Sequence, residues 1–247
     1  MERITEFYSD FKSALAACTP GYDDDELAEV VAHKASIPVD LDHYAPEQAT
    51  NSIVAVGIAA TGITERPLNV LDFGGGCGFH YFHVAAATRM NVRWAIVETP
   101  AMAKRAAKLA DGRFEVFTEI KSAAAALGEV HLVHASGSIQ YVPEPLATIK
   151  ELAALRAKYF AMARFPIWSG AKIVGLQGTQ LLGQGIGPPP SSIVNREIKI
   201  PITFENFHDV TKVISDYDIA WILRSESGDY SVGDRPASGM TFVLRLR

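Results

Sequence analysis

The sequence predicts an α/β fold: a doubly wound, mainly parallel, seven-stranded Rossmann-like sheet with an antiparallel C-terminal hairpin. Three observations lead to this prediction. From residue 68 onward short apolar runs alternate with helical patterns, a glycine-rich segment follows the first run, and a turn-rich segment joins the last two. Alternating strands and helices are typical of a parallel sheet that helices cover on both faces. The 247 residues suffice for one such domain with an appendage.

The expected elements follow from the spacing of apolar residues along the chain. Apolar runs predict strands at 68–73, 93–98, 114–118, 130–136 and 159–165. Helices are expected at 79–89, 100–110 and 145–157, with a short helical piece at 123–126. A helix over about 204–216 precedes the two strands of the hairpin, 219–225 and 240–246.

Two segments fall outside this alternation. Residues 1–66 are expected to form an N-terminal helical cap, because Phe7, Phe11 and Leu15 recur at four-residue spacing and Pro46 suits a first helical turn. Residues 67–247 then form the main domain. Within it, residues 168–203 are rich in glycine and proline and are predicted to be a long loop, a candidate lid, because loops of this length are usually functional or disordered.

Composition narrows the function classes. The net charge of −5 is spread along the chain without basic blocks, so nucleic acid is not an expected partner. Two cysteines are too few for a disulfide framework, and the chain opens without an apolar leader. The longest uncharged apolar stretch falls well short of the roughly 20 residues that a membrane-spanning helix needs. We therefore expect a cytoplasmic protein without a transmembrane segment.

The strongest functional signal is a glycine-rich loop that runs from a strand into a helix, Asp72-Phe73-Gly74-Gly75-Gly76-Cys77-Gly78. Glycines let the backbone make a tight turn and approach a nucleoside, and the following helix start adds free N–H donors. Glu98 ends the next apolar run, twenty residues beyond Gly78. A carboxylate there accepts hydrogen bonds from ribose hydroxyls in doubly wound folds. The alternative is that Glu98 only favours the start of the next helix.

The glycine spacing distinguishes two nucleotide-like cofactors. The dinucleotide fingerprint Gly-x-Gly-x-x-Gly fails in both registers, because Phe79 or Tyr81 stands where its third glycine belongs. The pattern here, Asp-x-Gly-x-Gly-x-Gly, is the usual form for S-adenosylmethionine (SAM). The loop therefore favours SAM over a nicotinamide cofactor.

Three segments resemble a family of small bacterial class I SAM-dependent methyltransferases that are often associated with polysaccharide and glycosyltransferase genes. These segments are 70–82, 94–102 and 135–146, and the resemblance covers about residues 68–166. It implies that Asp72, Gly74 and Gly76 line the methionine side of SAM and that Glu98 holds the ribose. It also implies roles for residues after three other strands: Ser136 and Gly137 beneath the cofactor, Phe117 or Thr118 beside adenine, and Gln140 and Tyr141 facing substrate. Phe73, Gly75 and Thr99 complete the cofactor-binding candidates.

Methyl transfer from a sulfonium needs positioning above all, and a base only where the acceptor must lose a proton. His80 and His83 lie on one face of the helix after the glycine loop, where His80 is a site candidate and His83 more often a packing residue. Arg164, at the ligand-bearing edge of the predicted sheet, is a candidate to hold an anionic acceptor, and the alternative is a surface ion pair.

Other polar residues give weaker signals. Three-residue spacing on a strand sends His131 and His134 to opposite faces, and no metal-binding motif is present, so no metal is expected. Aromatic residues of the cap are candidates to reach over the cleft or simply to pack: Tyr8, Tyr22, His43 and Tyr44.

The leading hypothesis is a SAM-dependent methyltransferase that acts on a small-molecule or sugar-linked acceptor, at oxygen, and releases S-adenosylhomocysteine (SAH). Two alternatives stay open. The same fold serves a non-catalytic SAM-fold binding or regulatory protein, or an NAD(P)-dependent oxidoreductase. A homo-oligomer is possible in each case.

Overall fold

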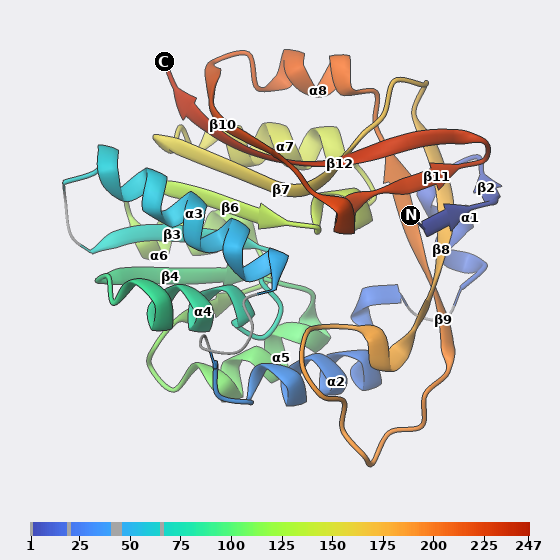
Figure 1. Ribbon diagram of the computed structural model, residues 1–247, viewed down its shortest axis with the longest axis horizontal. Coiled ribbons are helices and arrows are strands. Elements are labelled where there is room, and N and C mark those ends of the chain that lie inside the picture. The colour runs from blue at the N-terminus through green and yellow to red at the C-terminus, as the bar shows by residue number, and fades with distance from the viewer. Residues whose placement is uncertain (1, 19–20, 41–45, 65–66) are drawn as a thin grey trace.

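The computed structural model describes residues 2–18, 21–40, 46–64 and 67–247. Within these ranges a nine-stranded sheet forms the centre of the molecule, and helices cover both of its faces (Figure 1). Its strands are β1 (Glu2–Ile4), β3 (Leu68–Phe73), β4 (Val92–Val97), β5 (Glu115–Phe117), β6 (Leu132–Ser136), β7 (Tyr159–Ile167), β10 (Tyr217–Arg224), β11 (Tyr230–Val232) and β12 (Arg235–Leu246).

The seven predicted strands are all present, and they lie side by side in the order β5-β4-β3-β6-β7-β12-β10. Strands β3 to β7 pair in parallel, whereas β12 runs antiparallel to both β7 and β10. The doubly wound sheet and the antiparallel hairpin are therefore confirmed. Two short strands that the sequence did not indicate, β1 and β11, extend the sheet along the first residues of β12.

Apolar packing on the two faces of the sheet holds the fold together. Helices α3 (Glu47–Gly62) and α4 (Phe79–Thr88) bury residues such as Val56 and Val84 against one face, around the fully buried Trp94. The opposite face packs around Phe160 and Ile149. Its helices are α6 (Ile120–Leu127), α7 (Pro145–Ala154) and α8 (Phe207–Val213). Helix α5 (Pro100–Ala110) packs against α2 (Asp25–Ala35) beside the edge strand β5.

The expectation of a purely helical N-terminal cap is wrong in part. Helices α1 (Phe11–Ala16), α2 and α3 are present, and α3 begins at Glu47 with Pro46 just before it rather than in its first turn. Residues 2–8, however, form two strands, β1 and β2 (Glu6–Tyr8). The four-residue spacing of Phe7, Phe11 and Leu15 therefore spans one strand, β2, and helix α1. Because β1 joins the main sheet and α3 packs on it, this segment is built into the main domain.

The predicted long loop over 168–203 also needs correction. Residues 173–180 and 197–204 form strands β8 (Ile173–Gln180) and β9 (Glu197–Phe204), which pair antiparallel with each other. Strand β2 joins β8, so a second, three-stranded sheet stands beside the main one (Figure 1). Pairing with a distant N-terminal strand stabilised a segment whose glycines had suggested irregular structure. Within 168–203, only the connection between β8 and β9 is a long loop.

No helix among the described residues is long and apolar enough to cross a membrane.

Candidate functional site

The carboxyl ends of β3, β4, β6 and β7 surround a cavity of about 520 Å³, a volume typical of small-molecule sites. Crevices outside the carboxyl ends of parallel strands are where ligands bind in open α/β sheets. The walls come from the glycine loop, from residues 97–100, from residues 136–142 and from the small sheet with β1 and β11. Residues 183–186 and Val31 of α2 also line the cavity.

The glycine loop takes a conformation that requires glycine. Gly74 has φ +71°, and its backbone N–H donates to the carbonyl of Val97 at 2.9 Å, which ties the ends of β3 and β4 together. A Cβ on Gly74 would overlap the side chain of Ser138. Gly78 also has a positive φ, +92°, and precedes the first residue of α4. The loop therefore presents bare backbone to the cavity.

Glu98 follows β4 directly, and both of its carboxylate oxygens accept backbone hydrogen bonds. Oε1 accepts the N–H of Gly76 at 2.8 Å, and Oε2 accepts the N–H of Thr99 at 2.9 Å. Burial raises the pKa of Glu98 to about 7, against the opposing effect of these two hydrogen bonds. Each oxygen keeps a lone pair for a further donor from the cavity. The carboxylate is thus fixed in position and would gain from additional hydroxyl donors.

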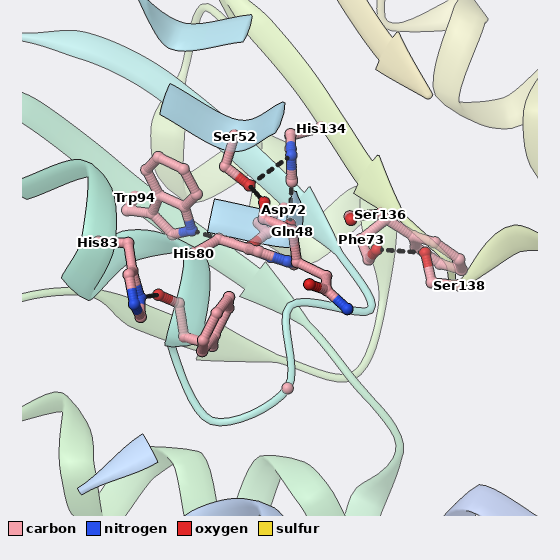
Figure 2. Close-up of polar contacts among 12 residues, drawn as sticks. Gln48, Ser52, Asp72, Phe73, His80, His83, Trp94, His134, Ser136 and Ser138 are labelled. Atoms are coloured by element: carbon pink, nitrogen blue, oxygen red, sulfur yellow. Dashed lines mark hydrogen bonds and ion pairs between the residues drawn. The ribbon is translucent and has the colours of Figure 1, made fainter. Parts of the chain in front are cut away.

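Asp72 lies beneath the loop, fully buried, at the centre of a polar cluster (Figure 2). Its Oδ1 is 2.7 Å from Nδ1 of His134, and its Oδ2 is 3.1 Å from Nδ1 of His80. Oδ2 also accepts the indole N–H of Trp94 at 3.2 Å. Burial alone would raise the pKa of Asp72, but the two imidazoles outweigh it and hold that pKa far below its usual range. Asp72 is therefore a buried anion that orients two histidines.

His80 is the member of this cluster that reaches the cavity. A carboxylate can only accept hydrogen bonds, so Nδ1 of His80 carries the ring proton and donates a hydrogen bond to Asp72. Burial lowers the pKa of His80 despite the neighbouring anion, which favours the neutral ring. In this tautomer Nε2 carries the free lone pair. The pair has the arrangement of a general base held in orientation by a carboxylate.

Arg164 lies at a β-bulge in β7, where two residues, Ala163 and Arg164, oppose the single residue Thr241 of β12. Its φ is +55°, which is rare for a residue with a side chain, and bulges next to active sites often redirect a side chain. The guanidinium lies over Gly137 and donates to the carbonyl of Ser136 at 3.0 Å. No carboxylate in the described ranges forms an ion pair with it. Among the described residues, this cation in the cavity wall therefore has no carboxylate as an ion-pair partner.

A directed chain of hydrogen bonds lines the end of the cavity formed by the small sheet. The hydroxyl of Tyr141 donates to Oε1 of Gln177 at 2.6 Å, so it accepts from the hydroxyl of Tyr230, 2.9 Å away. Nε2 of Gln177 then donates to Oε2 of Glu2 at 2.7 Å. Burial raises the pKa of Glu2. This end of the cavity is polar and presents a carboxylate, an amide and two hydroxyls.

A buried lysine holds the loop that closes the cavity. Nζ of Lys34 in α2 donates to the carbonyls of Leu182 at 2.7 Å and Gly185 at 3.2 Å, and burial lowers its pKa. Both carbonyls lie in the connection between β8 and β9. The part of the predicted lid that does border the cavity is thus attached to α2 by these hydrogen bonds.

Most of the site residues expected from the sequence line this one cavity: Phe73, Gly74, Gly75, Gly76, His80, Glu98, Thr99, Thr118, Ser136, Gly137, Gln140, Tyr141 and Arg164. Two do not. Asp72 is buried below the loop, and Phe117 packs against the core on the α6 face. Of the aromatic cap residues, Tyr22 lines the cavity and Tyr8 does not, while His43 and Tyr44 lie outside the described residues.

Sequence reasoning missed the polar end of the cavity. Glu2, Gln177 and Tyr230 belong to β1, β8 and β11, three strands that are far apart in the sequence; β1 pairs with β11, and β8 pairs with β2, which follows β1. No local motif marks these residues, so only the tertiary structure brings them to the site. His131 and His134 are both hydrogen-bonded in the interior: Nδ1 of His131 accepts the N–H of Asn69, and His134 contacts Asp72 and Ser52.

Comparison with known proteins bears on the fold. No family model matches the sequence, and no curated protein matches it. Solved structures do match. The N-terminal domain of EvdMO1 with SAH bound is 14% identical with a TM-score of 0.53, covering 82% of each chain. The CcbJ methyltransferase from Streptomyces caelestis is 12% identical with a TM-score of 0.53, covering 92% of this chain and 98% of that one. A SAM-dependent methyltransferase from Clostridium acetobutylicum ATCC 824 is 8% identical with a TM-score of 0.51, covering 80% and 92%. This likeness shows that the chain adopts the Rossmann-like fold of these methyltransferases.

Proposed function

We propose that this protein is a SAM-dependent methyltransferase, with SAH as its product. The observation that carries the proposal is the placement of Glu98: a fixed, half-buried carboxylate at the end of β4, facing the same cavity as the bare backbone of Gly74 to Gly76. Ribose hydroxyls are the donors that such a carboxylate accepts in doubly wound folds. Several solved structures with this fold are methyltransferases, and one was crystallised with SAH bound.

The residues present fit a nucleoside joined to an amino acid. Glu98 would hold the ribose, Thr118 would border the base, and the backbone of the glycine loop with Gly137 would border the amino-acid portion. Val97, Pro100 and Met102 add apolar surface near Glu98. When bound, SAM supplies a methyl group on a sulfonium, which is transferred by in-line displacement. The protein's part is to orient the acceptor and to exclude water.

We assign the acceptor atom to a hydroxyl oxygen, with His80 as general base. A hydroxyl must lose its proton as it is methylated, and the neutral His80 keeps a lone pair on Nε2. Asp72 holds the ring in this tautomer and would stabilise the imidazolium that forms. A sugar-linked acceptor fits the polar end of the cavity with Glu2 and Gln177. The EvdMO1 domain, which shares the fold, was also crystallised in the presence of SAH and D-fucose.

We further assign Arg164 to binding an anionic group of the acceptor, such as a carboxylate or a phosphate. The guanidinium lies in the cavity wall without a carboxylate partner among the described residues, and its two bonds to Ser136 leave other N–H donors free. Planar guanidinium donors match carboxylate and phosphate oxygens well. An alternative ligand for the same group is the carboxylate of the methionine portion.

The test of the cofactor is calorimetric titration of the purified protein with SAH, beside NAD. We expect saturable SAH binding that Glu98→Ala weakens at least tenfold, because two charge-assisted hydrogen bonds are lost. Glu115→Ala, at an exposed ion pair on the next strand, is the matched control and should bind SAH normally. Absence of SAH binding, or tighter binding of NAD, would overturn the proposal. Production of SAH with an acceptor separates an enzyme from a non-catalytic binding protein.

The test of Arg164 uses Arg164→Gln with SAH and with 5′-methylthioadenosine, which lacks the amino-acid portion. If Arg164 binds the acceptor, both nucleosides bind the variant as they bind the wild type, and an anionic acceptor loses affinity. If SAH alone weakens, the arginine holds the methionine carboxylate and our assignment is wrong.

A further inference from the structure

Strand β10 forms an edge of the main sheet with unusual composition. It pairs only with β12, so in the described part of the chain its outer edge has no strand beside it. Its centre is Ile219-Ala220-Trp221-Ile222-Leu223, five apolar residues in succession. Ile219, Ile222 and Leu223 are 60%, 47% and 41% exposed. The unpaired backbone N–H and C=O groups of an exposed apolar edge strand can pair with a strand of another chain. Natural proteins avoid such edges unless the edge has a partner.

The exposed apolar residues of β10 lie on both faces of the sheet. Cross-strand neighbours share a face, and Ile219 and Ile222 are opposite Leu244 and Phe242, which belong to the core under α7 and α8. Trp221 and Leu223 are opposite Val243 and Thr241 and therefore face the α3 side. Packing a helix or loop on one face would cover only half of these residues. A strand added at the edge would shield both rows.

The charges at the ends of β10 point to the partner. Asp218 is the second residue of the strand and Arg224 is the last, and each already has an oppositely charged neighbour: Arg247 at 2.8 Å from Asp218, and Asp229 beside Arg224. When two copies of the same strand pair antiparallel, the first end of one lies beside the last end of the other. Asp218 of each copy then approaches Arg224 of the other, whereas parallel pairing would place like charges together.

We propose that β10 is the contact surface through which a second copy of this chain binds, with the two β10 strands antiparallel about a two-fold axis. A closed two-fold contact is self-complementary and needs only one such surface on each subunit. In the register that sets Asp218 opposite Arg224, the two-fold axis passes beside Trp221, which is midway between them in the strand. The dimer would contain one continuous sheet. This inference is independent of the proposed activity.

The experiment is sedimentation equilibrium of the full chain over about 1 to 100 µM, because dimerisation depends on concentration. We expect a monomer–dimer equilibrium whose Kd rises about tenfold or more in Ile222→Lys, which places a charge at the edge. Val194→Lys is the control, because Val194 is 83% exposed and lies in the connection between β8 and β9. It should leave the Kd unchanged. A single cooperative thermal unfolding transition in each variant shows that the variants are folded.

Charge reversal tests the antiparallel arrangement. Asp218→Arg or Arg224→Asp alone should weaken the dimer by bringing like charges together, and the double variant should recover most of the loss. A wild-type protein that stays monomeric across the range would overturn the proposal. A dimer that Ile222→Lys leaves unchanged would also overturn it, because the contact would then lie elsewhere.

Discussion

At the scale of single residues, the site depends on carboxyl groups whose environments push their pKa values in opposite directions. Glu98 has a pKa raised to about 7 by burial, and Asp72 has one far below its usual range because two imidazoles face it. Glu98 accepts two backbone hydrogen bonds and can accept more, whereas Asp72 already accepts from three side chains. This difference distinguishes a group prepared to receive a ligand from a group that holds its neighbours in place.

The raised pKa of Glu98 predicts how stability changes with pH. A carboxyl group whose folded pKa exceeds its unfolded value, 4.5, stabilises the fold at low pH and loses that contribution as pH rises toward the folded value, about 7. Over this window we expect the free energy of unfolding of the ligand-free protein to fall by roughly 3 kcal/mol relative to Glu98→Gln. Urea unfolding of both proteins between pH 4.5 and 8 checks this. A difference that does not change with pH would contradict it.

Asp72→Asn is expected to destabilise the protein by roughly 3 kcal/mol, because an amide cannot accept from His80, His134 and Trp94 at once and adds donors where donors already point. Denaturant unfolding measures this change. Asp209→Asn, which removes an exposed ion pair with Lys212, is the control and should cost under about 0.5 kcal/mol. The pKa of Asp72 is lowered in the folded protein, so the ionised carboxylate stabilises the fold. This contribution to the free energy of unfolding is lost as acidification protonates the group. Equal effects of the two substitutions would show that the buried cluster contributes nothing special.

At the scale of elements, the loop between β3 and α4 and the bulge in β7 determine which groups reach the cavity. Both use backbone conformations outside the ordinary helix and strand regions: φ is positive at Gly74 and Gly78 in the loop and at Arg164 in the bulge. The glycines in the sequence predict the conformation of the loop between β3 and α4. The bulge has no such marker, because it depends on how β7 aligns with β12.

Gly74→Ala separates the two reasons for a glycine in the loop. Gly112 has nearly the same φ, +73° against +71°, but nothing lies within 4 Å of a Cβ placed there, whereas a Cβ on Gly74 overlaps the side chain of Ser138. We expect Gly112→Ala to cost about 1 kcal/mol from backbone strain. Gly74→Ala should cost at least about 2 kcal/mol more and weaken SAH binding. Thermal unfolding and calorimetry measure these effects, and similar losses in both variants would rule out crowding as the cause.

At the scale of the whole molecule, the N-terminal segment pairs with strands that are distant in the sequence. Strand β1 pairs with β11, and β2 pairs with β8, so the first residues join both sheets. This arrangement places Glu2 in the cavity wall and buries Ile4 completely beside Trp168 and Phe204. The N-terminal segment is therefore a structural part of the site.

Ile4→Ala is expected to destabilise the protein by about 2 to 4 kcal/mol, since it removes a fully buried side chain between the sheets. Leu15→Ala, at a residue of α1 that is 42% exposed, should cost clearly less. Urea unfolding followed by circular dichroism compares the two. Equal small losses would indicate that β1 contributes little to the fold.

The sequence by itself determined the parallel sheet, the glycine loop and the Glu98 carboxylate, because each depends on residues close together in the chain: an apolar run, a turn that needs glycine, and a strand that ends in an acidic residue. It also brought His80 and Arg164 into consideration as single residues. The tertiary structure decided the rest. Pairing over more than 200 residues brought Glu2 beside Tyr230, an interstrand bulge turned Arg164 into the cavity, and burial made Asp72 a hidden anion behind His80. These features depend on contacts between segments that are distant in the sequence, and the spacing of apolar residues along the chain does not predict such contacts.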